Sequence, residues 1–462
     1  MTALSALQLQ AFSKQQLIDL VLELYSAVTR LEEKVTLLES ELLSLKKNSS
    51  NSSKPPSSDF PIKRNQSLRQ PSGKPSGGQI GHPGTTRTQV EHPDIVIPCK
   101  PSHCERCGIE LSNIPGTLTG KRQEADIPPI KAVVTEYQQE EIICPCCGKR
   151  NMGTFPEDVR AQFQIGDNLK SFVAYLNVAH HVPFERLTNL LSDLLSFRVS
   201  EGTVDNVLDD AEVARTPLSL GILNLIKQYS WTGSDESGVR VEGKTWWQWT
   251  WQNLLGTYYA IEPSRGYDVV KKHFGEDYEG DFLHDCWNAQ NNTHARRHQL
   301  CHPHLLRDLQ FCIDAEGSRW AGNMTDFLLE SERIRDALWV EGYDPKQRER
   351  IIRSTHERFQ RLIHGRIKGT ESQTLQKRFR KHHDKILTFL SDPNLPFHNN
   401  SSEQAIRNAK LHKKISGGFR SERGARRHAV LLSIIETCKK RKMDILLSLK
   451  QLFQGTLAFS AC

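Results

Sequence analysis

The sequence has no long apolar run and no recognisable export signal. No hydrophobic stretch approaches the roughly 20 residues that a membrane-spanning helix needs. The opening residues 1–10, MTALSALQLQ, lack the basic start and the apolar core of a signal peptide. We therefore expect a cytoplasmic protein with no membrane partner.

A strong excess of one charge is also missing. The formal net charge is only +7, from 61 Lys and Arg against 54 Asp and Glu. Basic residues nevertheless concentrate between Lys46 and Lys100 and again between Arg407 and Lys442. Such segments suit contact with a polyanion, and a merely solvated surface would show them equally well. The length of 462 residues and the hydrophobic content of 37% are ordinary for a soluble protein with about three domains.

Cysteine is plentiful, at 11 residues, and six of these lie within the stretch 99–147. In a cytoplasmic chain this clustering indicates metal binding rather than disulfides. Two CxxC turns flank a strand-like stretch, 127–143, and four thiolates suit one tetrahedral Zn²⁺ with no open position for chemistry. We therefore predict a zinc ribbon with one structural Zn²⁺, whose ligands are Cys104, Cys107, Cys144 and Cys147. Cys146 has no assigned role.

The N-terminal region carries apolar residues at alternating spacings of four and three: Leu17, Val21, Leu24, Val28, Leu31, Val35, Leu38, Leu42 and Leu45. β-Branched residues at most a positions with Leu at d favour a parallel coiled-coil homodimer. The alternative is an amphipathic helix packed on its own domain. The following stretch, 46–89, is rich in Ser, Pro, Gly and Lys and predicts a linker, which either contacts phosphates or only spaces domains.

Residues 165–214 have helical periodicity with a break at 197–199. Ser200 is a plausible N-cap for the second helix. The helix 183–195, the break and the second helix resemble a helix-turn-helix. A small helical bundle that braces the next domain is the alternative, since the second helix has few basic residues.

Strand-like segments follow at 230–241, 244–252, 256–261, 280–285 and 297–304, with a helix-like stretch at 267–278 before the fourth. Three strands, a helix, then strands alternating with helices is the order of a ribonuclease-H-like fold. In that fold, carboxylates at the ends of neighbouring strands meet at one edge of the sheet. Asp235 on the first strand and Asp285 at the end of the fourth fit those places. The neighbouring Glu236 should point to the opposite face.

A third carboxylate, Glu403, opens a predicted helix that follows two prolines. Arg407, Lys410 and Lys414 recur at helical spacing after it and share its face. This arrangement suits a metal ion beside DNA phosphates, although an ordinary exposed helix face could show it too.

Several motifs occur together in one order: NSSKPPSSD at 51–59, GGQIGHPG at 77–84, the two CxxC turns, Asp235-Glu-Ser, HQLCHPH at 298–304, NNSSEQAIR at 399–407 and SIIETC at 433–438. Together they resemble the insertion-sequence-66 family of bacterial DDE transposases over nearly the whole chain. The resemblance implies that Asp235, Asp285 and Glu403 are the catalytic triad. Where the family usually has Cys-Trp-Ala-His, this chain has Cys-His-Pro-His, and His302 and His304 receive no role.

The resemblance implies an enzyme that uses two Mg²⁺ (or Mn²⁺) ions to hydrolyse DNA at the ends of a mobile element and to join the freed ends to target DNA. Asp235 would bridge the two ions, and Asp285 and Glu403 would each complete one site. The expected partners are double-stranded DNA, contacted by Arg407, Lys410 and Lys414, a second copy of the chain, and small accessory proteins of the same element. Two alternatives are a dimeric zinc-ribbon DNA-binding regulator with an inactive core, and a structure-selective nuclease.

The predicted fold class is multidomain α/β, with a ribonuclease-H-like catalytic core interrupted by a helical insertion. The predicted segments are a coiled-coil helix (1–47), a basic linker (48–95), a zinc ribbon (96–155), a helical domain (156–225), the first part of the core (226–315), the helical insertion (316–392), the second part of the core with Glu403 (393–445) and a C-terminal tail (446–462).

Overall fold

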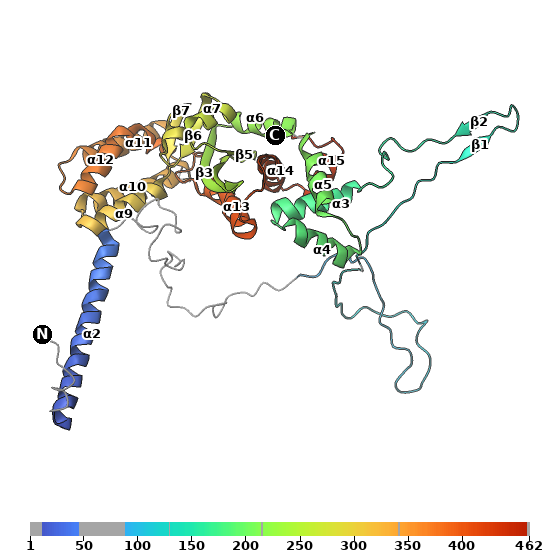
Figure 1. The fold of residues 1–462 in the computed structure, drawn as a ribbon, viewed down its shortest axis with the longest axis horizontal. Helices are drawn as coiled ribbons and strands as arrows, with labels where there is room; N and C mark the ends of the chain where they lie inside the picture. The colour runs from blue at the N-terminus through green and yellow to red at the C-terminus, as the bar shows by residue number, and fades with distance from the viewer. Residues whose placement is uncertain (1–11, 46–87, 129, 214–215, 341, 460–462) are drawn as a thin grey trace.

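A mixed five-stranded sheet lies at the centre of the molecule (Figure 1). The computed structural model describes residues 12–45, 88–128, 130–213, 216–340 and 342–459. The strands are β3 (Trp231–Val241), β4 (Lys244–Gln252), β5 (Thr257–Glu262), β6 (Asp277–His284) and β7 (His294–Leu300). Their order across the sheet is β5-β4-β3-β6-β7. Strands β3, β4 and β5 are antiparallel neighbours, whereas β3, β6 and β7 run parallel.

The sequence explains both kinds of connection. Glu242 and Gly243 join β3 to β4 with φ angles of 51° and 74°, the left-handed conformation that a tight two-residue hairpin requires. Parallel strands need a crossover, and helix α7 (Tyr267–His273) supplies it between β5 and β6. The expected helix 267–278 was too long, because the chain already enters β6 at Asp277.

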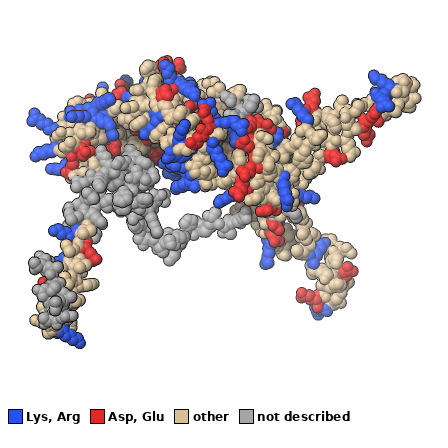
Figure 2. Space-filling view, viewed as in Figure 1, with Lys and Arg blue, Asp and Glu red and all other residues tan. Residues whose placement is uncertain are grey.

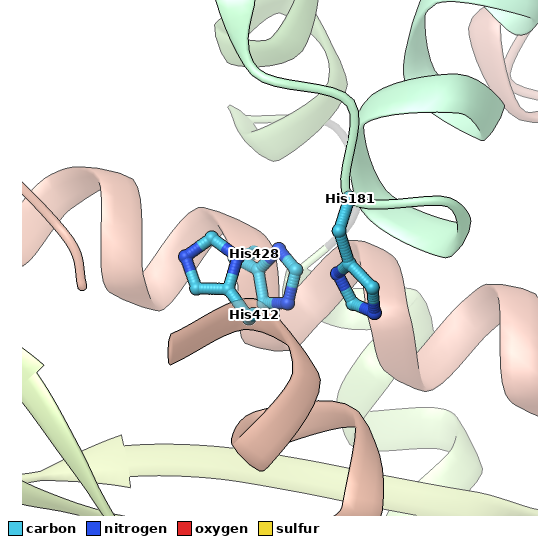
Figure 3. A group of neighbouring side chains, drawn as sticks. All are labelled: His181, His412 and His428. Atoms are coloured by element: carbon cyan, nitrogen blue, oxygen red, sulfur yellow. The ribbon is translucent and has the colours of Figure 1, made fainter. Parts of the chain in front are cut away.

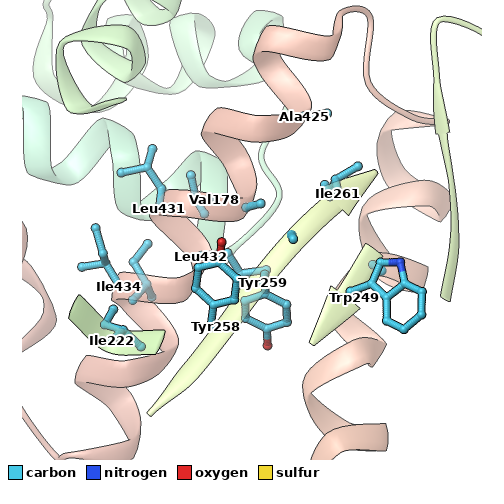
Figure 4. Close-up of a cluster of buried hydrophobic side chains, with 14 of the residues drawn as sticks. Val178, Ile222, Trp249, Tyr258, Tyr259, Ile261, Ala425, Leu431, Leu432 and Ile434 are labelled. Atoms are coloured by element: carbon cyan, nitrogen blue, oxygen red, sulfur yellow. The ribbon is translucent and has the colours of Figure 1, made fainter. Parts of the chain in front are cut away.

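Helices cover both faces of the sheet. The short helices α7 and α8 (Asn288–Asn291) lie on one face, where Phe274 after α7 stacks on Trp251 and Gln290 of α8 bonds Glu236, and α13 (Asn400–Ser416) and α14 (Glu422–Lys440) lie on the other. On the second face, the Tyr259 amide donates to Ser433 Oγ (2.9 Å), and the Tyr259 hydroxyl donates to the Ala405 carbonyl (3.1 Å). On the first face, Trp249 (Figure 4) and Trp251 are fully buried and belong to the core.

A group of helices precedes the sheet: α3 (Asp167–Ala174), the π-helical turn η2 (Tyr175–Ala179), α4 (Phe184–Leu195), α5 (Glu201–Val213) and α6 (Thr216–Lys227). Ser200 caps α5 as predicted, because its Oγ accepts from the Thr203 amide at 3.1 Å. Arg427 of α14 pairs with Asp205 and Asp209 of α5. An acidic helix held in this way matches the bracing bundle better than a DNA-reading helix.

The C-terminal segment departs from the expected tail. Residues Ile445–Phe453 form helix α15, which packs on α3 and buries Leu449 and Leu452. Asp444 caps this helix through the Leu447 amide (2.8 Å). A nine-residue amphipathic helix has too few turns for its periodicity to stand out, so only its packing reveals it.

The predicted helical insertion is helical throughout most of its length. It contains α10 (Arg319–Val340), α11 (Pro345–His364), α12 (Thr370–Lys381) and the 3₁₀ turns η3 (His383–Lys385) and η4 (Thr388–Ser391), and it follows α9 (His302–Glu316). These elements enclose a second apolar core, which includes Phe327, Phe359 and Phe379 and reaches Leu283 of the sheet.

The N-terminal third has little tertiary packing. Helix α2 (Lys14–Leu45) is one continuous helix, and its apolar side chains Val21, Leu24, Val28 and Leu31 are each more than half exposed. The expected strand 127–143 is mostly irregular, and only β1 (Glu141–Ile143) pairs, with β2 (Arg150–Met152). Most of the predicted linker 48–95 lies outside the described residues. Among the described helices, none is both long and apolar enough to cross a membrane.

Candidate active site

The first two predicted acids lie on neighbouring parallel strands. The pairing of β3 with β6 sets Gly233 beside Leu283. Continuing that register by two residues sets Asp235 beside Asp285, which directly follows the last residue of β6. Asp235 lies two residues after Gly233 on β3, so both residues lie on the face of the sheet that α13 covers. The sheet therefore brings together two acids that are 50 positions apart.

The third predicted acid reaches the same edge on the first turn of α13. Asn399 precedes this helix, and its Nδ2 donates to the Ser234 carbonyl at 2.7 Å instead of capping the helix. Gln252 of β4 donates to the Ser401 hydroxyl at 2.7 Å. These two amides fix the start of α13 against the sheet and set the position of Glu403.

Gly233 permits this close approach. A Cβ atom at position 233 would lie 2.6 Å from Ser402 Oγ and 2.9 Å from Asn399 Oδ1, so any other residue here would force these side chains or the start of α13 to shift. The glycine is therefore required by the contact between β3 and α13 rather than by its backbone angles.

His304 lies between two of the acids. Its Nε2 is 3.2 Å from Asp285 Oδ2, and its Nδ1 is 3.8 Å from Glu403 Oε1. Asp285, Cys301 and His304 can also place one ligand atom each within 4.8 Å of the others. Sequence reasoning gave His304 no role. Its position just after the end of β7, the strand that lies next to β6 in the sheet, was the available signal.

Burial, together with neighbouring negative charge, raises the pKa values of two carboxyl groups. Burial, followed by Asp285 and Glu236, raises the pKa of Asp235 well above its ordinary value. Burial, followed by Glu403 and Glu236, raises the pKa of Asp285 to about 7. Burial and the nearby Arg307 lower the pKa of His304 to about 4. At neutral pH the site therefore holds acids that are costly to ionise beside a neutral imidazole.

The oxygens of this site fit a divalent cation. Asp285 Oδ1 and Glu403 Oε1 are buried and have no hydrogen-bond partner among the residues that the structure describes. Buried carboxylate oxygens without a partner are unfavourable unless a cation balances them. Hard oxygen ligands of this kind, few in number, are those that Mg²⁺ and Mn²⁺ accept.

Neighbouring acids have other partners. As expected, Glu236 points away from Asp235, toward Arg265 (2.7 Å) and Gln290 (2.8 Å) on the other face of the sheet. Asp281, four residues before Asp285, is held by two arginines of β7, which lower its pKa. His302 is buried and bonds the Ile386 carbonyl (2.9 Å) and Glu332, so it supports the insertion rather than the site.

The three predicted DNA-contacting cations lie on α13. Arg407, Lys410 and Lys414 are exposed, and none of them pairs with another described residue. Figure 2 shows Lys and Arg side chains gathered over the part of the molecule where α13 lies. The helix that places Glu403 at the sheet edge therefore also presents a cationic surface.

The predicted zinc cysteines form two similar but separate turns. The backbone carbonyls of Cys104 and Cys144 accept hydrogen bonds from the backbone amides of Gly108 and Gly148, each at 2.9 Å. Backbone amides of the following residues lower the pKa values of both Cys104 and Cys144. In the described part of the chain, the four sulfurs do not lie within ligand distance of one another. The two CxxC turns are therefore apart.

Comparison with known sequences covers most of the chain. A family model described as Transposase IS66 family matches residues 162–427, more than half of the chain and all three predicted acids. A second model, described as a family of unknown function, matches residues 7–88.

Two proteins of Sinorhizobium fredii (strain NBRC 101917 / NGR234) are similar to this chain. The uncharacterized protein y4jO is 27% identical over 148 residues, which are 31% of this chain and 44% of y4jO. The uncharacterized protein y4hP is 22% identical over 401 residues, which are 77% of this chain and 70% of y4hP. The match therefore spans less than half the length of y4jO.

Proposed function

Because this chain belongs to the IS66 family of transposases, we propose that Asp235, Asp285 and Glu403 are the catalytic residues of a metal-dependent DNA cleavage and strand-transfer reaction. The observation that carries the proposal is their convergence. The middle of β3, the end of β6 and the first turn of α13, three distant parts of the chain, bring acids close to buried oxygens that lack a partner among the described residues. An acidic cluster required only for folding would be expected to have arginine or lysine partners, as Asp281 has.

The strand order supports a ribonuclease-H-like core. Numbered in chain order, the five strands lie as 3-2-1-4-5, with the first three antiparallel and the last two parallel to the first. In such a sheet the first and fourth strands are neighbours, and Asp235 of the first lies beside Asp285 at the end of the fourth. Glu403 then comes from the helix that follows the insertion.

Two Mg²⁺ (or Mn²⁺) ions held by Asp235, Asp285 and Glu403 would activate a water molecule and stabilise the leaving oxygen of a phosphodiester. The reaction would be hydrolysis that frees a 3′-hydroxyl at each element end, followed by attack of that hydroxyl on target DNA. His304 would orient the Asp285 and Glu403 carboxylates, because its two nitrogens face one oxygen of each. It is thus a positioning residue in this proposal.

Arg407, Lys410 and Lys414 would bind the DNA backbone next to the reacting phosphate. They follow Glu403 at successive turns of α13, so phosphates along one strand could contact the helix while the scissile phosphate lies at its start. Lysine and arginine contacts of this kind supply affinity without reading sequence.

The N-terminal third would serve assembly and DNA contact. The exposed apolar face of α2 would pair with α2 of a second copy, giving a parallel coiled-coil dimer. The two CxxC turns would close around one structural Zn²⁺, which would order the exposed residues 96–155. The expected accessory proteins of the same element stay a prediction.

The test uses purified full-length protein, DNA that carries the element ends, and Mg²⁺ or Mn²⁺. Asp235→Asn, Asp285→Asn and Glu403→Gln should each reduce strand transfer below detection while binding of the ends is retained. Asp277→Asn, an exposed position at the start of β6, is the matched control and should keep full activity. Retained joining in any of the three variants would refute the role of that residue.

The same assay separates the alternatives. Cutting of branched DNA without joining would identify a structure-selective nuclease. DNA binding that is indifferent to Mg²⁺, with no nicking of either strand, would identify a DNA-binding regulator with an inactive core.

A further inference from the structure

Three histidines from separate parts of the fold meet away from the acidic site (Figure 3). His181 lies between η2 and α4, His412 lies on α13, and His428 lies on α14. Their ring centroids are 5.8, 6.2 and 4.9 Å apart. One nitrogen from each ring can be chosen so that all three lie within 4.8 Å of one another.

These rings are buried with most of their nitrogens unpaired. His181 is 2% exposed and His428 is 6% exposed. Both nitrogens of His181, both nitrogens of His412 and Nε2 of His428 have no hydrogen-bond partner in the described part of the chain. Buried polar atoms in proteins almost always have partners, so five unpaired nitrogens in one cluster need an explanation.

Three other histidines of the interior, His284, His298 and His302, have hydrogen-bond partners. His284 Nε2 faces His298 Nδ1 at 2.9 Å, and His298 Nε2 bonds the Thr293 carbonyl at 3.0 Å. His302 has partners on both of its nitrogens. His304 and His398 each have one buried nitrogen without a partner in the described part of the chain, whereas His181 and His412 each have two.

The backbone holds His181 in an unusual conformation. Its φ is 56°, in the left-handed region that non-glycine residues seldom adopt. Asn177 Nδ2 donates to the Val182 carbonyl at 2.9 Å and secures the turn. A strained residue whose side chain points at two other imidazoles is typical of a functional position.

We propose that His181, His412 and His428 bind one borderline transition-metal ion of the Zn²⁺ class, which ties the helices before the sheet to α13 and α14. Neutral imidazole nitrogens are ligands for Zn²⁺, Co²⁺ and Ni²⁺, whereas Mg²⁺ prefers oxygen. Burial is the first cause that lowers the pKa of each ring, so the three are neutral near pH 7.

The required movement is small. Zn–N bonds of about 2.0–2.1 Å in tetrahedral geometry hold ligand nitrogens about 3.4 Å apart. From separations of up to 4.8 Å, rotations of the rings that shift the nitrogens by on the order of 1 Å would close the site. Three protein ligands leave a fourth position for water.

The metal would act on the helix that carries a proposed catalytic residue. His412 lies nine residues after Glu403 on α13, about 13 Å along the helix axis. A metal ion bound to His412 would fix α13 relative to His181 without contacting the three acids. This site is separate from the proposed catalytic site, and failure of one proposal leaves the other unaffected.

The competing explanation is an aromatic cluster without a metal. His412 stacks on Phe419 with centroids 4.2 Å apart, and Phe419 also contacts His428. If that explanation is right, His181, His412 and His428 bind no metal.

The test uses the full chain with Cys104, Cys107, Cys144 and Cys147 replaced by Ser, which removes the proposed cysteine site in exposed segments. Equilibrium dialysis with Co²⁺ in excess Mg²⁺ should find one bound equivalent, with a visible absorption band and no thiolate charge-transfer band. In this background, His181→Gln and His412→Gln should each lose that equivalent. His180→Gln, the exposed neighbour of His181, should keep it.

Absence of bound Co²⁺ and Zn²⁺ in the four-serine chain would overturn the proposal, as would unchanged binding in folded His181→Gln and His412→Gln proteins. If the histidine variants do not fold, X-ray absorption of Zn²⁺ bound to the four-serine chain decides. Ligation by about three imidazoles supports the site, and ligation by oxygen alone refutes it.

Discussion

Replacement of Asp285 by Asn should stabilise the metal-free protein while abolishing its activity. The carboxylate lies among Glu403, Glu236 and Asp235, and no described residue donates to its Oδ1. Asn keeps the shape and removes the charge. In the absence of a divalent cation, the ionised Asp285 carboxylate therefore lowers the free energy of unfolding.

The magnitude follows from the pKa of this carboxyl group. It titrates near 3.8 when unfolded and at about 7 in the fold. Between these values the folded chain keeps a proton that the unfolded chain has lost, so the free energy of unfolding falls as pH rises from about 4 to about 7. Above pH 7 the full cost of roughly three pKa units is about 4 kcal/mol. Because 24% of the side chain stays exposed and the charges are shared, we expect about 2 kcal/mol.

The assay is urea unfolding in EDTA, followed by the fluorescence of the eight tryptophans, four of which lie on β4. At pH 8 the Asp285→Asn protein should exceed the unsubstituted protein by about 2 kcal/mol, and at pH 5 by about a third of that. Mg²⁺ should stabilise only the unsubstituted protein.

The matched control is Asp281→Asn, on the same strand. Two arginines hold Asp281 and lower its pKa, so this replacement should reduce stability at pH 8. A loss of stability in the Asp285→Asn protein at pH 8, or a difference that does not change with pH, would refute the account of charge crowding at the site.

Three further predictions test other parts of the molecule. Lys410→Gln and Lys414→Gln should each weaken DNA binding at all sequences and reduce the slope of log K against log salt by about 0.9, measured by fluorescence anisotropy; an unchanged slope would remove these lysines from the interface. Val28→Lys, at an a position of α2, should convert the dimer to a monomer in sedimentation, and a persistent dimer would place the interface elsewhere. Gly233→Ala should lower strand transfer, because the new Cβ would lie 2.6 Å from Ser402 Oγ and displace α13; full activity would show that this contact is not needed.

The local sequence pattern was sufficient to predict many of the helices and strands. Strand β4 has the predicted bounds of Lys244–Gln252, and α4 and α5 flank the predicted break before Ser200. Each of these segments combines a clear period with strong start and stop residues, so its local preference and its tertiary environment agree. The stretch 127–143 failed because its β-branched residues suggest a strand, whereas a strand also needs a neighbour to pair with, and only residues 141–143 have one.

The sequence offers three acids as candidates for the site, but it does not reveal which residues surround them in the fold. Strand order and the resemblance to a family point to Asp235, Asp285 and Glu403. His304 was left without a role, and the amides of Asn399 and Gln252 were not considered, because their function depends on what lies across from them in the fold. A single histidine or amide carries no periodic signal.

The sequence by itself predicted many of the elements and the likeness to the IS66 family, and it singled out three acids as candidates, because these depend on side-chain period and on short motifs of fixed spacing. Only the tertiary structure decided which face each acid shares, that His304 lies between two of them, and that His181 meets His412 and His428. Contacts between residues more than 200 positions apart arise from strand register and helix packing. These are properties of the whole chain that no local window contains.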